Sequence, residues 1–259
     1  LRKDEGDEVR KNFQRMGVDI ETVEASETFL SELAGVSDPE KKREIIGNLF
    51  IKVFWDSVGD ADMLAQGTLY PDVIESASNA KTKASKIKTH HNRVEKILEL
   101  QKQGKVLEPL AELFKDEVRE LGLSLGIQPD IVHRHPFPGP GLAVRCPGEV
   151  TPDRLRIIQE CDSIFISLLR QHDWYDKVWQ AYAALVPVKT VGVKGDERSY
   201  EFAVSLRAVV SEDAMTADWV ELPYQILRDS SNQILNSVPG VNRVLYDVST
   251  KPPASIEWE

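Results

Sequence analysis

The stretch Arg134-His-Pro-Phe-Pro-Gly-Pro-Gly-Leu142 is the point at which the predicted organisation of this chain changes. It cannot be ordinary helix or strand, because proline has no N–H group and a fixed φ, so it is a shaped loop. The sequence before it alternates helix and strand patterns in the manner of an α/β domain, and the sequence after it has the pattern of an α+β domain. We therefore divide the chain into domains at residues 1–135 and 136–259.

In the first domain, the pattern predicts a helix at residues 7–15 and a short apolar strand at residues 18–23. A further helix begins at Asp38-Pro-Glu-Lys, and Pro109 is expected to open another. The positions expected to be buried in this last helix are Leu110, Leu113, Phe114, Val118 and Leu121. Because a helix is already under way near residue 1, we expect the first strands of a doubly wound domain to be missing.

In the second domain, Thr151 and Pro152 are typical of a helix start, and the helix carries a buried stripe. The stripe consists of Leu155, Ile158, Phe165 and Leu169. Strands are predicted at residues 178–188, 190–194, 200–207 and 243–249, and a second helix after Pro223. Three or four strands with helices on one face form a small layered domain, and we expect a second copy of the chain to cover the other face.

Composition excludes several classes of function. The 259 residues are 41% hydrophobic and 29% charged, which is an ordinary balance for a folded protein, and the formal net charge of −10 argues against binding to nucleic acid or to an anionic membrane. No apolar run reaches the roughly 20 residues that span a bilayer, and the charged first residues do not resemble a signal peptide, so we expect a cytoplasmic location. Cys146 and Cys161 are too few for a disulfide framework or a metal site and are interpreted as structural thiols.

Two carboxylates stand out in Gly67-Thr-Leu-Tyr-Pro-Asp-Val-Ile-Glu-Ser76. Asp72 and Glu75 are three residues apart, so one helical turn places both on one face. Such a pair can hold Mg²⁺ or orient a ligand amine or ribose hydroxyl. From spacing alone, a solvated first turn whose acids favour the helix dipole is the preferred interpretation, and the ligand-binding one stays open.

The next segment, residues 76–87, lacks apolar periodicity and is rich in lysine. Its lysines, with Lys88, could close over phosphates in an otherwise acidic protein. His90 and His91 follow. Adjacent histidines cannot face the same way on a helix or strand, so a shared metal is not expected. Either one histidine meets a ligand, or both are satisfied polar residues at a helix start.

A second proline-containing stretch, Lys251-Pro-Pro-Ala-Ser-Ile-Glu-Trp-Glu259, completes the set of unusual strings. The strings GTLYPDVIES, IKTHHN, RHPFPGPGLAVR and KPPASIEWE occur in the order found in the GMP synthase family, which the chain resembles along essentially its whole length. The family consists of glutamine-hydrolysing amidotransferases that convert XMP to GMP. The resemblance implies an α/β partial ATP pyrophosphatase (adenine nucleotide α-hydrolase-like) domain, followed by a small α+β dimerisation and XMP-binding domain.

The resemblance also implies the chemistry, which belongs to purine nucleotide biosynthesis. The family is a ligase that adenylates the xanthine carbonyl with ATP and Mg²⁺, after which ammonia displaces AMP. The residues that match the family's XMP-binding positions are Arg2, Asp72, Arg134, Gln180, Lys251 and Glu257. The residues that match its catalytic lid are Asp72, Glu75, Lys88, His90 and His91, with Lys115 and Asp116 as a possible link to lid movement. No residue is assigned as a metal ligand.

The expected partners are XMP, ATP, ammonia from a glutaminase domain, and a second copy of the chain in a homodimer. The sequence lacks the family's Ser-Gly-Gly-Val-Asp-Ser phosphate loop and its glutaminase triad. We therefore expect this chain to supply XMP binding and dimerisation and to be inactive alone. The alternatives are a non-catalytic nucleotide-binding dimerisation module, or another ATP pyrophosphatase such as NAD synthase or argininosuccinate synthase. Those two enzymes lack the KPPASIEWE string.

Overall fold

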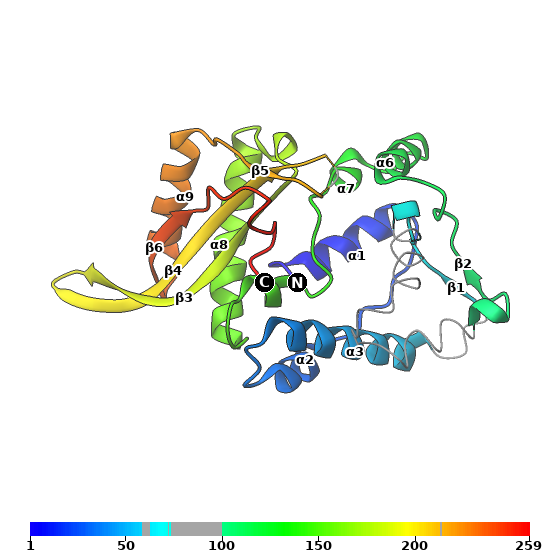
Figure 1. Cartoon of the computed structure of the whole chain (residues 1–259), viewed down its shortest axis with the longest axis horizontal. Helices are drawn as coiled ribbons and strands as arrows, with labels where there is room; N and C mark the ends of the chain where they lie inside the picture. The colour runs from blue at the N-terminus through cyan, green and yellow to red at the C-terminus, as the bar shows by residue number, and fades with distance from the viewer. Residues whose placement is uncertain (59–62, 72, 74–99, 213) are drawn as a thin grey trace. The chain divides into compact units, whose positions relative to one another are not determined.

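The computed structural model of the chain describes residues 1–58, 63–71, 73, 100–212 and 214–259 (Figure 1). It is a mixed α/β protein with small sheets, and it divides into two compact units. The first unit combines Leu1–Ile46 with His135–Glu259, and the second is Gly47–Arg134. The structural border therefore falls at the predicted loop, but the first unit also takes in the N-terminal segment. The division into family domains at residues 1–135 and 136–259 remains a proposal.

A four-stranded sheet forms the centre of the first unit, and the sequence predicted all of its strands except the short β5. Its strands are β3 (Gln180–Lys194), β4 (Glu197–Val210), β5 (Asp218–Trp219) and β6 (Val241–Tyr246). β4 pairs antiparallel with β3 and β5 and parallel with β6. The strands predicted at residues 178–188 and 190–194 are one strand whose register shifts between Val186 and Lys189. Pro187 lies at the shift, where its missing N–H group removes a ladder bond.

Two helices, α8 (Pro152–Gln171) and α9 (Tyr224–Ser237), pack on one face of this sheet (Figure 1). The predicted start of α8 is confirmed, since Thr151 Oγ1 accepts a hydrogen bond from Arg154 N and Pro152 occupies the first turn. Apolar side chains at alternating strand positions meet the helix stripe in a common core. The strand members are Ala181, Ala183, Leu185, Val204, Leu206 and Ala208, and the helix members include Ile158, Phe165, Leu169, Ile226 and Ile234.

The opposite face carries Tyr182 and Arg207, which are directly paired across β3 and β4. The closing residues 251–259, here called the tail, lie against it: Tyr182 Oη and Arg207 Nε both donate hydrogen bonds to the Ile256 carbonyl, at 2.6 Å and 2.9 Å. The chain itself therefore covers this part of the face that the sequence analysis had assigned to a second copy.

The N-terminal part of the first unit holds α1 (Glu5–Arg15), α2 (Ser26–Leu33) and the start of α3 (Pro39–Val58). The helix predicted at residues 7–15 is confirmed within α1. The strand predicted at residues 18–23 is wrong, because this segment has no regular structure. Val18 and Val23 are each 46% exposed, and no strand among the described residues pairs with this segment to bury its apolar side chains.

The described elements of the second unit are the rest of α3, β1 (Leu64–Ala65), β2 (Val106–Leu107), α6 (Lys115–Ser124) and α7 (Pro129–Val132). β1 and β2 pair in parallel. The helix predicted to open at Pro109 begins at Lys115 instead, and Phe114 and Leu121 are exposed rather than buried. The Glu117 carboxylate accepts a hydrogen bond from Phe114 N, which favours a helix start at this position.

Candidate functional site

The tail is held by cations that have no exposed surface. Lys42, Arg145 and Arg207 are all 0% exposed. They come from α3, from the 3₁₀ helix η1 (Gly141–Arg145) and from β4, so segments distant in sequence meet at the tail. Burying a charge is costly unless the charge is paired and hydrogen-bonded. Each of these cations therefore needs partners within the fold.

Arg145 forms a bidentate contact with the carboxylate of Glu257. Its Nε donates to Glu257 Oε2 and its Nη2 donates to Oε1, each at 2.9 Å. The guanidinium also lies over two rings, 4.1 Å from the centroid of Tyr182 and 5.0 Å from that of Phe137. The two hydrogen bonds and the ring contacts prevent the guanidinium and the carboxylate from rotating. Glu257 therefore has a defined orientation.

Gln180 completes this arrangement from the first residue of β3. Its Nε2 donates a hydrogen bond of 2.5 Å to Glu257 Oε1. Gln180 is buried, and the side chain of Glu257 keeps 17% of its surface exposed. Two residues that the resemblance assigned to XMP binding are therefore in direct contact, and Glu257 remains accessible to a ligand.

Asp162 connects this pair to Arg2. Its Oδ1 accepts a hydrogen bond from Ala183 N at 3.1 Å, and its Oδ2 lies 3.3 Å from Arg2 Nε. Arg2 Nη2 in turn donates to the carbonyl of Ala181 at 3.1 Å. These contacts satisfy backbone groups along the outer edge of β3, where no strand of the described residues pairs with it. Asp162 also lies 3.9 Å from Arg145 Nη1, so it stands between two arginines.

His135, in the Pro-Gly loop, covers the same edge of β3. Its Nδ1 accepts from Ala181 N at 3.2 Å, so the ring proton is on Nε2, which donates to the carbonyl of Tyr175 at 2.8 Å. The ring also stacks on that of Tyr175, with 3.8 Å between centroids. Burial lowers the pKa of His135 to about 4, so the imidazole is neutral near pH 7 and acts as scaffold.

Arg207 shapes the chain before and within the tail. Besides Ile256, it donates hydrogen bonds of 3.0 Å to the carbonyls of Ser249 and Ser255, and its Nη1 lies 3.1 Å from Asp247 Oδ2. One side chain thus holds three carbonyls of a segment that contains two consecutive prolines. Because proline cannot donate a backbone hydrogen bond, such a segment needs side chains to define its path.

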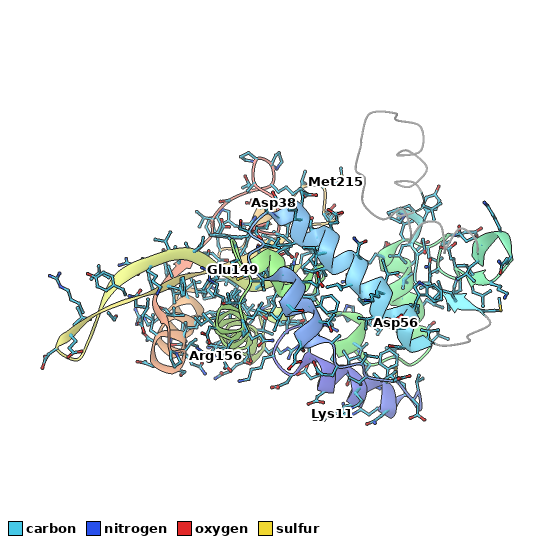
Figure 2. The ribbon with its side chains drawn as sticks, turned by 90° about the horizontal axis from the view of Figure 1, so that it is seen from below. Lys11, Asp38, Asp56, Glu149, Arg156 and Met215 are labelled. Carbon is cyan, nitrogen blue, oxygen red and sulfur yellow. The ribbon has the colours of Figure 1, made fainter. Side chains whose placement is uncertain are left out.

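The end of the tail is anchored separately. Lys42 Nζ lies 2.5 Å from Glu259 Oε2 and donates to the carbonyl of Cys146 at 2.8 Å. Gly148 N donates to Glu259 Oε1 at 3.3 Å. The loop ahead of α8 is tied down further by Glu149, labelled in Figure 2, whose carboxylate accepts a hydrogen bond from Gly35 N at 2.9 Å. Glu257 and Glu259, two residues apart, therefore have different buried cations as partners.

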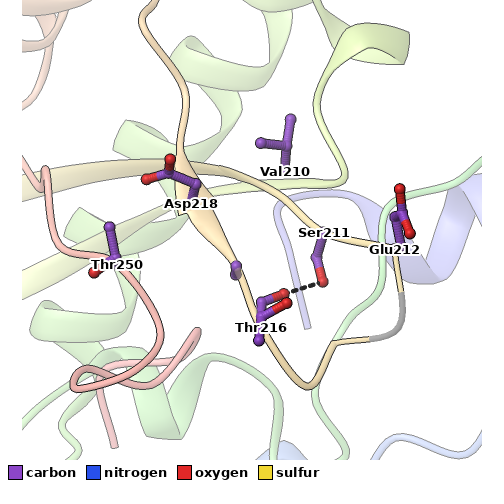
Figure 3. A pocket seen from close by; sticks show the side chains of 7 residues that line it. Val210, Ser211, Glu212, Thr216, Asp218 and Thr250 are labelled. Carbon is purple, nitrogen blue, oxygen red and sulfur yellow. Dashed lines mark hydrogen bonds between the residues drawn. The ribbon is translucent and has the colours of Figure 1, made fainter.

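Lys251 lies at the other end of the tail. Its backbone forms two hydrogen bonds with Ala217, and its Nζ donates to the carbonyl of Ala214 at 2.9 Å. The adjacent residue, Thr250, lines a cavity of about 560 Å³ (Figure 3). The other lining residues are Val210, Ser211, Glu212, Thr216, Ala217 and Asp218. The carboxylates of Glu212 and Asp218 disfavour an anion inside this cavity.

The remaining assigned residues are not brought into this cluster. Arg134 is exposed and belongs to the second compact unit. Asp72, Glu75, Lys88, His90 and His91 lie outside the described residues. Lys115 and Asp116 form the start of α6 in the second unit.

Sequence reasoning missed Arg145, Asp162, Lys42 and Arg207. Asp162 had a detectable signal, because it is a carboxylate between Ile158 and Phe165 in the predicted buried stripe. Nothing in the local pattern separates the other three from surface cations.

Other classes of site find no support in the described part of the chain. Among those residues, no group of three or more His, Cys, Asp or Glu side chains could hold a metal ion. Across the same residues, no helix is both long and apolar enough to cross a bilayer. Cys146 and Cys161 are free buried thiols, and burial raises their pKa values to about 11 and about 12. They are therefore protonated, unreactive structural thiols, as the sequence predicted.

Comparisons with known proteins show which family the chain is similar to. Residues 167–258, which include the four strands of the central sheet, α9 and most of the tail, match the family model described as GMP synthase C terminal domain. The chain is 54% identical to "GMP synthase [glutamine-hydrolyzing]" of Flavobacterium psychrophilum, 56% to that of Alkalilimnicola ehrlichii and 55% to that of Thermotoga maritima. Each match covers 100% of this chain and 51%, 50% and 52% of the respective relative, so the chain spans about half the length of the curated relatives it matches.

The family-model match is therefore confined to residues 167–258, while the similarity to the curated relatives extends over the whole chain. The chain as a whole is homologous to about half of glutamine-hydrolysing GMP synthase.

Proposed function

We propose that this chain is the XMP-binding and dimerising part of a GMP synthase, a ligase that aminates XMP to GMP with ATP and glutamine-derived ammonia. The observation that carries the proposal is the contact of Gln180 with Glu257, whose carboxylate is oriented by Arg145 and partly exposed. This contact lies in the domain that the chain shares with its GMP synthase relatives.

The chemistry of these groups fits a nucleotide. The oriented carboxylate of Glu257 can accept a hydrogen bond from a ribose hydroxyl or a purine N–H, and the Gln180 amide offers both a donor and an acceptor. The Lys251 ammonium currently has the neutral Ala214 carbonyl as its partner, which a phosphate oxygen could replace as a stronger acceptor. Arg2 adds a cation at the same end of β3.

We assign the ATP-dependent step to residues 1–135, as an ATP pyrophosphatase-like domain, on the resemblance alone. There Asp72, Glu75, Lys88, His90 and His91 are proposed as the lid over the adenylation site. Its task is to align the xanthine carbonyl oxygen with the α-phosphorus and to neutralise the leaving pyrophosphate. Mg²⁺ is proposed to accompany the ATP phosphates, and no step is assigned to it here because the described residues offer no cluster of ligands for it. A cytoplasmic location is part of the same proposal.

Calorimetric titration of the 259-residue chain with XMP tests the binding role. We expect saturable binding, and Lys251→Ala should weaken it by about 10- to 100-fold, the usual cost of losing a hydrogen bond to a charged group. Lys177→Ala, which removes an exposed lysine that lies over Trp174, is the matched control. Unchanged affinity in Lys251→Ala would place the phosphate site elsewhere, and no binding by the wild-type chain would contradict the proposed function.

The homodimer is proposed from apolar side chains left exposed on the β3–β4 hairpin. Val188, Val191, Val193 and Tyr200 are exposed by 52% to 74%. An apolar patch of this kind on a small sheet is typical of an interface. Light scattering at micromolar concentration should give about twice the 29.2 kDa chain mass, and a persistent monomer would contradict the proposal.

A further inference from the structure

The contact between Arg145 and Glu257 has features that a simple anchor of the tail does not need. Arg145 uses Nε and Nη2 on one carboxylate, while its Nη1 is buried with no hydrogen-bond partner among the described residues. Asp162 Oδ1, at 3.9 Å, compensates the charge without forming that bond. A buried donor without a hydrogen-bond partner destabilises the folded chain. The same placement of Arg145 fixes the plane of the Glu257 carboxylate.

We propose that Arg145, backed by Asp162, is a positioning residue that orients the Glu257 carboxylate for the nucleotide. The inference rests on the proposed function, because it takes XMP as the molecule that Glu257 meets. Arg145 itself has no exposed surface, so it acts through Glu257 and not by touching the ligand.

The hydrogen-bond inventory of Glu257 explains what the orientation achieves. A carboxylate has about four acceptor positions. Arg145 Nη2 and Gln180 Nε2 use the two on Oε1, and Arg145 Nε uses one on Oε2. One acceptor position, on Oε2, is therefore left for a ligand. If the carboxylate rotated, Gln180 would lose its partner and the free position would point elsewhere.

Glu259 provides an internal comparison, because it is also paired with a fully buried cation. Lys42 meets Glu259 as a single ammonium, and Gly148 N and the side chain of Arg43 complete the anchoring of that residue. A lysine fixes a position but not a carboxylate plane. We therefore assign the Lys42 contact to docking of the tail, and the Arg145 contact to orientation.

The experiment measures XMP affinity and thermal stability of the 259-residue chain in matched variants. Arg145→Lys keeps the charge but cannot form the fork, and we expect XMP binding to weaken by about 10- to 100-fold. Glu257→Gln should cause a similar loss. In the double variant the losses should not add, and affinity should stay within about 3-fold of Glu257→Gln alone. Lys42→Met should lower the melting temperature, and its loss of XMP affinity should be smaller than that of Arg145→Lys.

A crystal structure of Arg145→Lys supplies a measurement that needs no ligand. We expect the Glu257 carboxylate to leave Gln180 while Glu259 stays on Lys42. If Arg145→Lys does not fold, Asp162→Asn takes its place, because the amide oxygen can still accept from Ala183 N while the charge is lost. We expect Asp162→Asn to weaken XMP binding by about 3- to 10-fold. No such loss is expected in the Glu257→Gln background.

Wild-type affinity in Arg145→Lys, additive losses in the double variant, or an unmoved Glu257 would each overturn the inference. If the wild-type chain does not bind XMP, the proposed function fails. The crystal structure then decides the inference alone: a displaced Glu257 supports positioning by Arg145, and an unmoved one overturns it.

Discussion

The two faces of the central sheet are buried in opposite ways. Against α8 and α9 the sheet presents apolar side chains such as Leu185 and Leu206, and the contacts have no preferred direction. Against the tail it presents Tyr182 and Arg207, which form directed hydrogen bonds to carbonyl groups. On the first face, each apolar surface that is buried stabilises the fold. On the second face, the hydrogen bonds must first offset the desolvation cost of the buried charges.

This difference indicates what each face is for. A buried ion pair contributes little net stability compared with apolar side chains of the same volume, but it defines geometry because its bonds are directional. The helix-covered face is therefore the source of stability in this domain, and the tail-covered face determines where Glu257 and Lys251 lie.

The largest expected effect is on the helix face. Phe165→Ala removes a fully buried ring from α8 and should lower the free energy of unfolding by about 3–5 kcal/mol through the cavity that it leaves. Urea unfolding measures the loss, which should not depend on salt. Tyr224→Ala, which alters a side chain that is 88% exposed, is the control and should cost less than about 0.5 kcal/mol. A loss below about 1 kcal/mol in Phe165→Ala would contradict the role assigned to this face.

The next effect is on the tail face. Arg207→Met keeps the apolar stem but removes the hydrogen bonds to Ser249, Ser255 and Ile256 and leaves Asp247 without this cation. We expect a loss of about 2–4 kcal/mol, because breaking one side of a buried pair leaves the other side desolvated. Urea unfolding beside Arg198→Met, an exposed arginine of the same hairpin, measures it. A variant as stable as wild type would show that the tail face contributes no net stability.

The smallest effect is a pH dependence at the edge of β3, between the two faces. The pKa of His135 is about 4 in the folded chain and about 6.5 when unfolded, so the unfolded chain binds the proton more readily. The contribution of the neutral His135 ring to the free energy of unfolding is complete above about pH 6.5. It is lost as the pH falls towards 4, with about 2 kcal/mol lost at pH 5. Unfolding of wild type and His135→Gln at pH 7 and pH 5 measures it. The difference in the free energy of unfolding between wild type and His135→Gln should be smaller at pH 5 than at pH 7. An unchanged difference would contradict the assignment of a buried neutral ring.

The sequence was most informative where local rules and periodicity agree. Thr151 and Pro152 marked the start of α8, Pro223 preceded α9, and the alternation of Tyr200, Phe202, Val204 and Leu206 marked β4. It was least informative at short apolar runs. Residues 18–23 contain apolar residues typical of a short strand but pair with no described strand, and the apolar residues from 110 to 114 precede α6 instead of lying within it. Periodicity records which side chains can be buried, but not whether a neighbour is there to bury them.

The candidate site was predictable only in part. Gln180 and Glu257 were assigned from strings that resemble a known family, and the structure places them in contact. Arg2 was assigned in the same way and is joined to them through Asp162 and Arg145, which were not predicted. A buried arginine and a surface arginine look alike in sequence, because burial depends on residues more than a hundred positions away, as in the contact of Arg145 with Glu257.

By itself, the sequence determined α8, α9 and the longer strands of the central sheet, the apolar stripe of α8, and a shaped proline-rich tail. These follow from interactions within a few residues: capping, 3.6- and 2-residue periods, and the fixed φ of proline. Only the tertiary structure decided that the tail folds onto the sheet and that Lys42, Arg145 and Arg207 become its buried partners. The physical reason is that a charge is buried only where folding brings an opposite charge or a set of carbonyls to it, and no local pattern encodes that meeting.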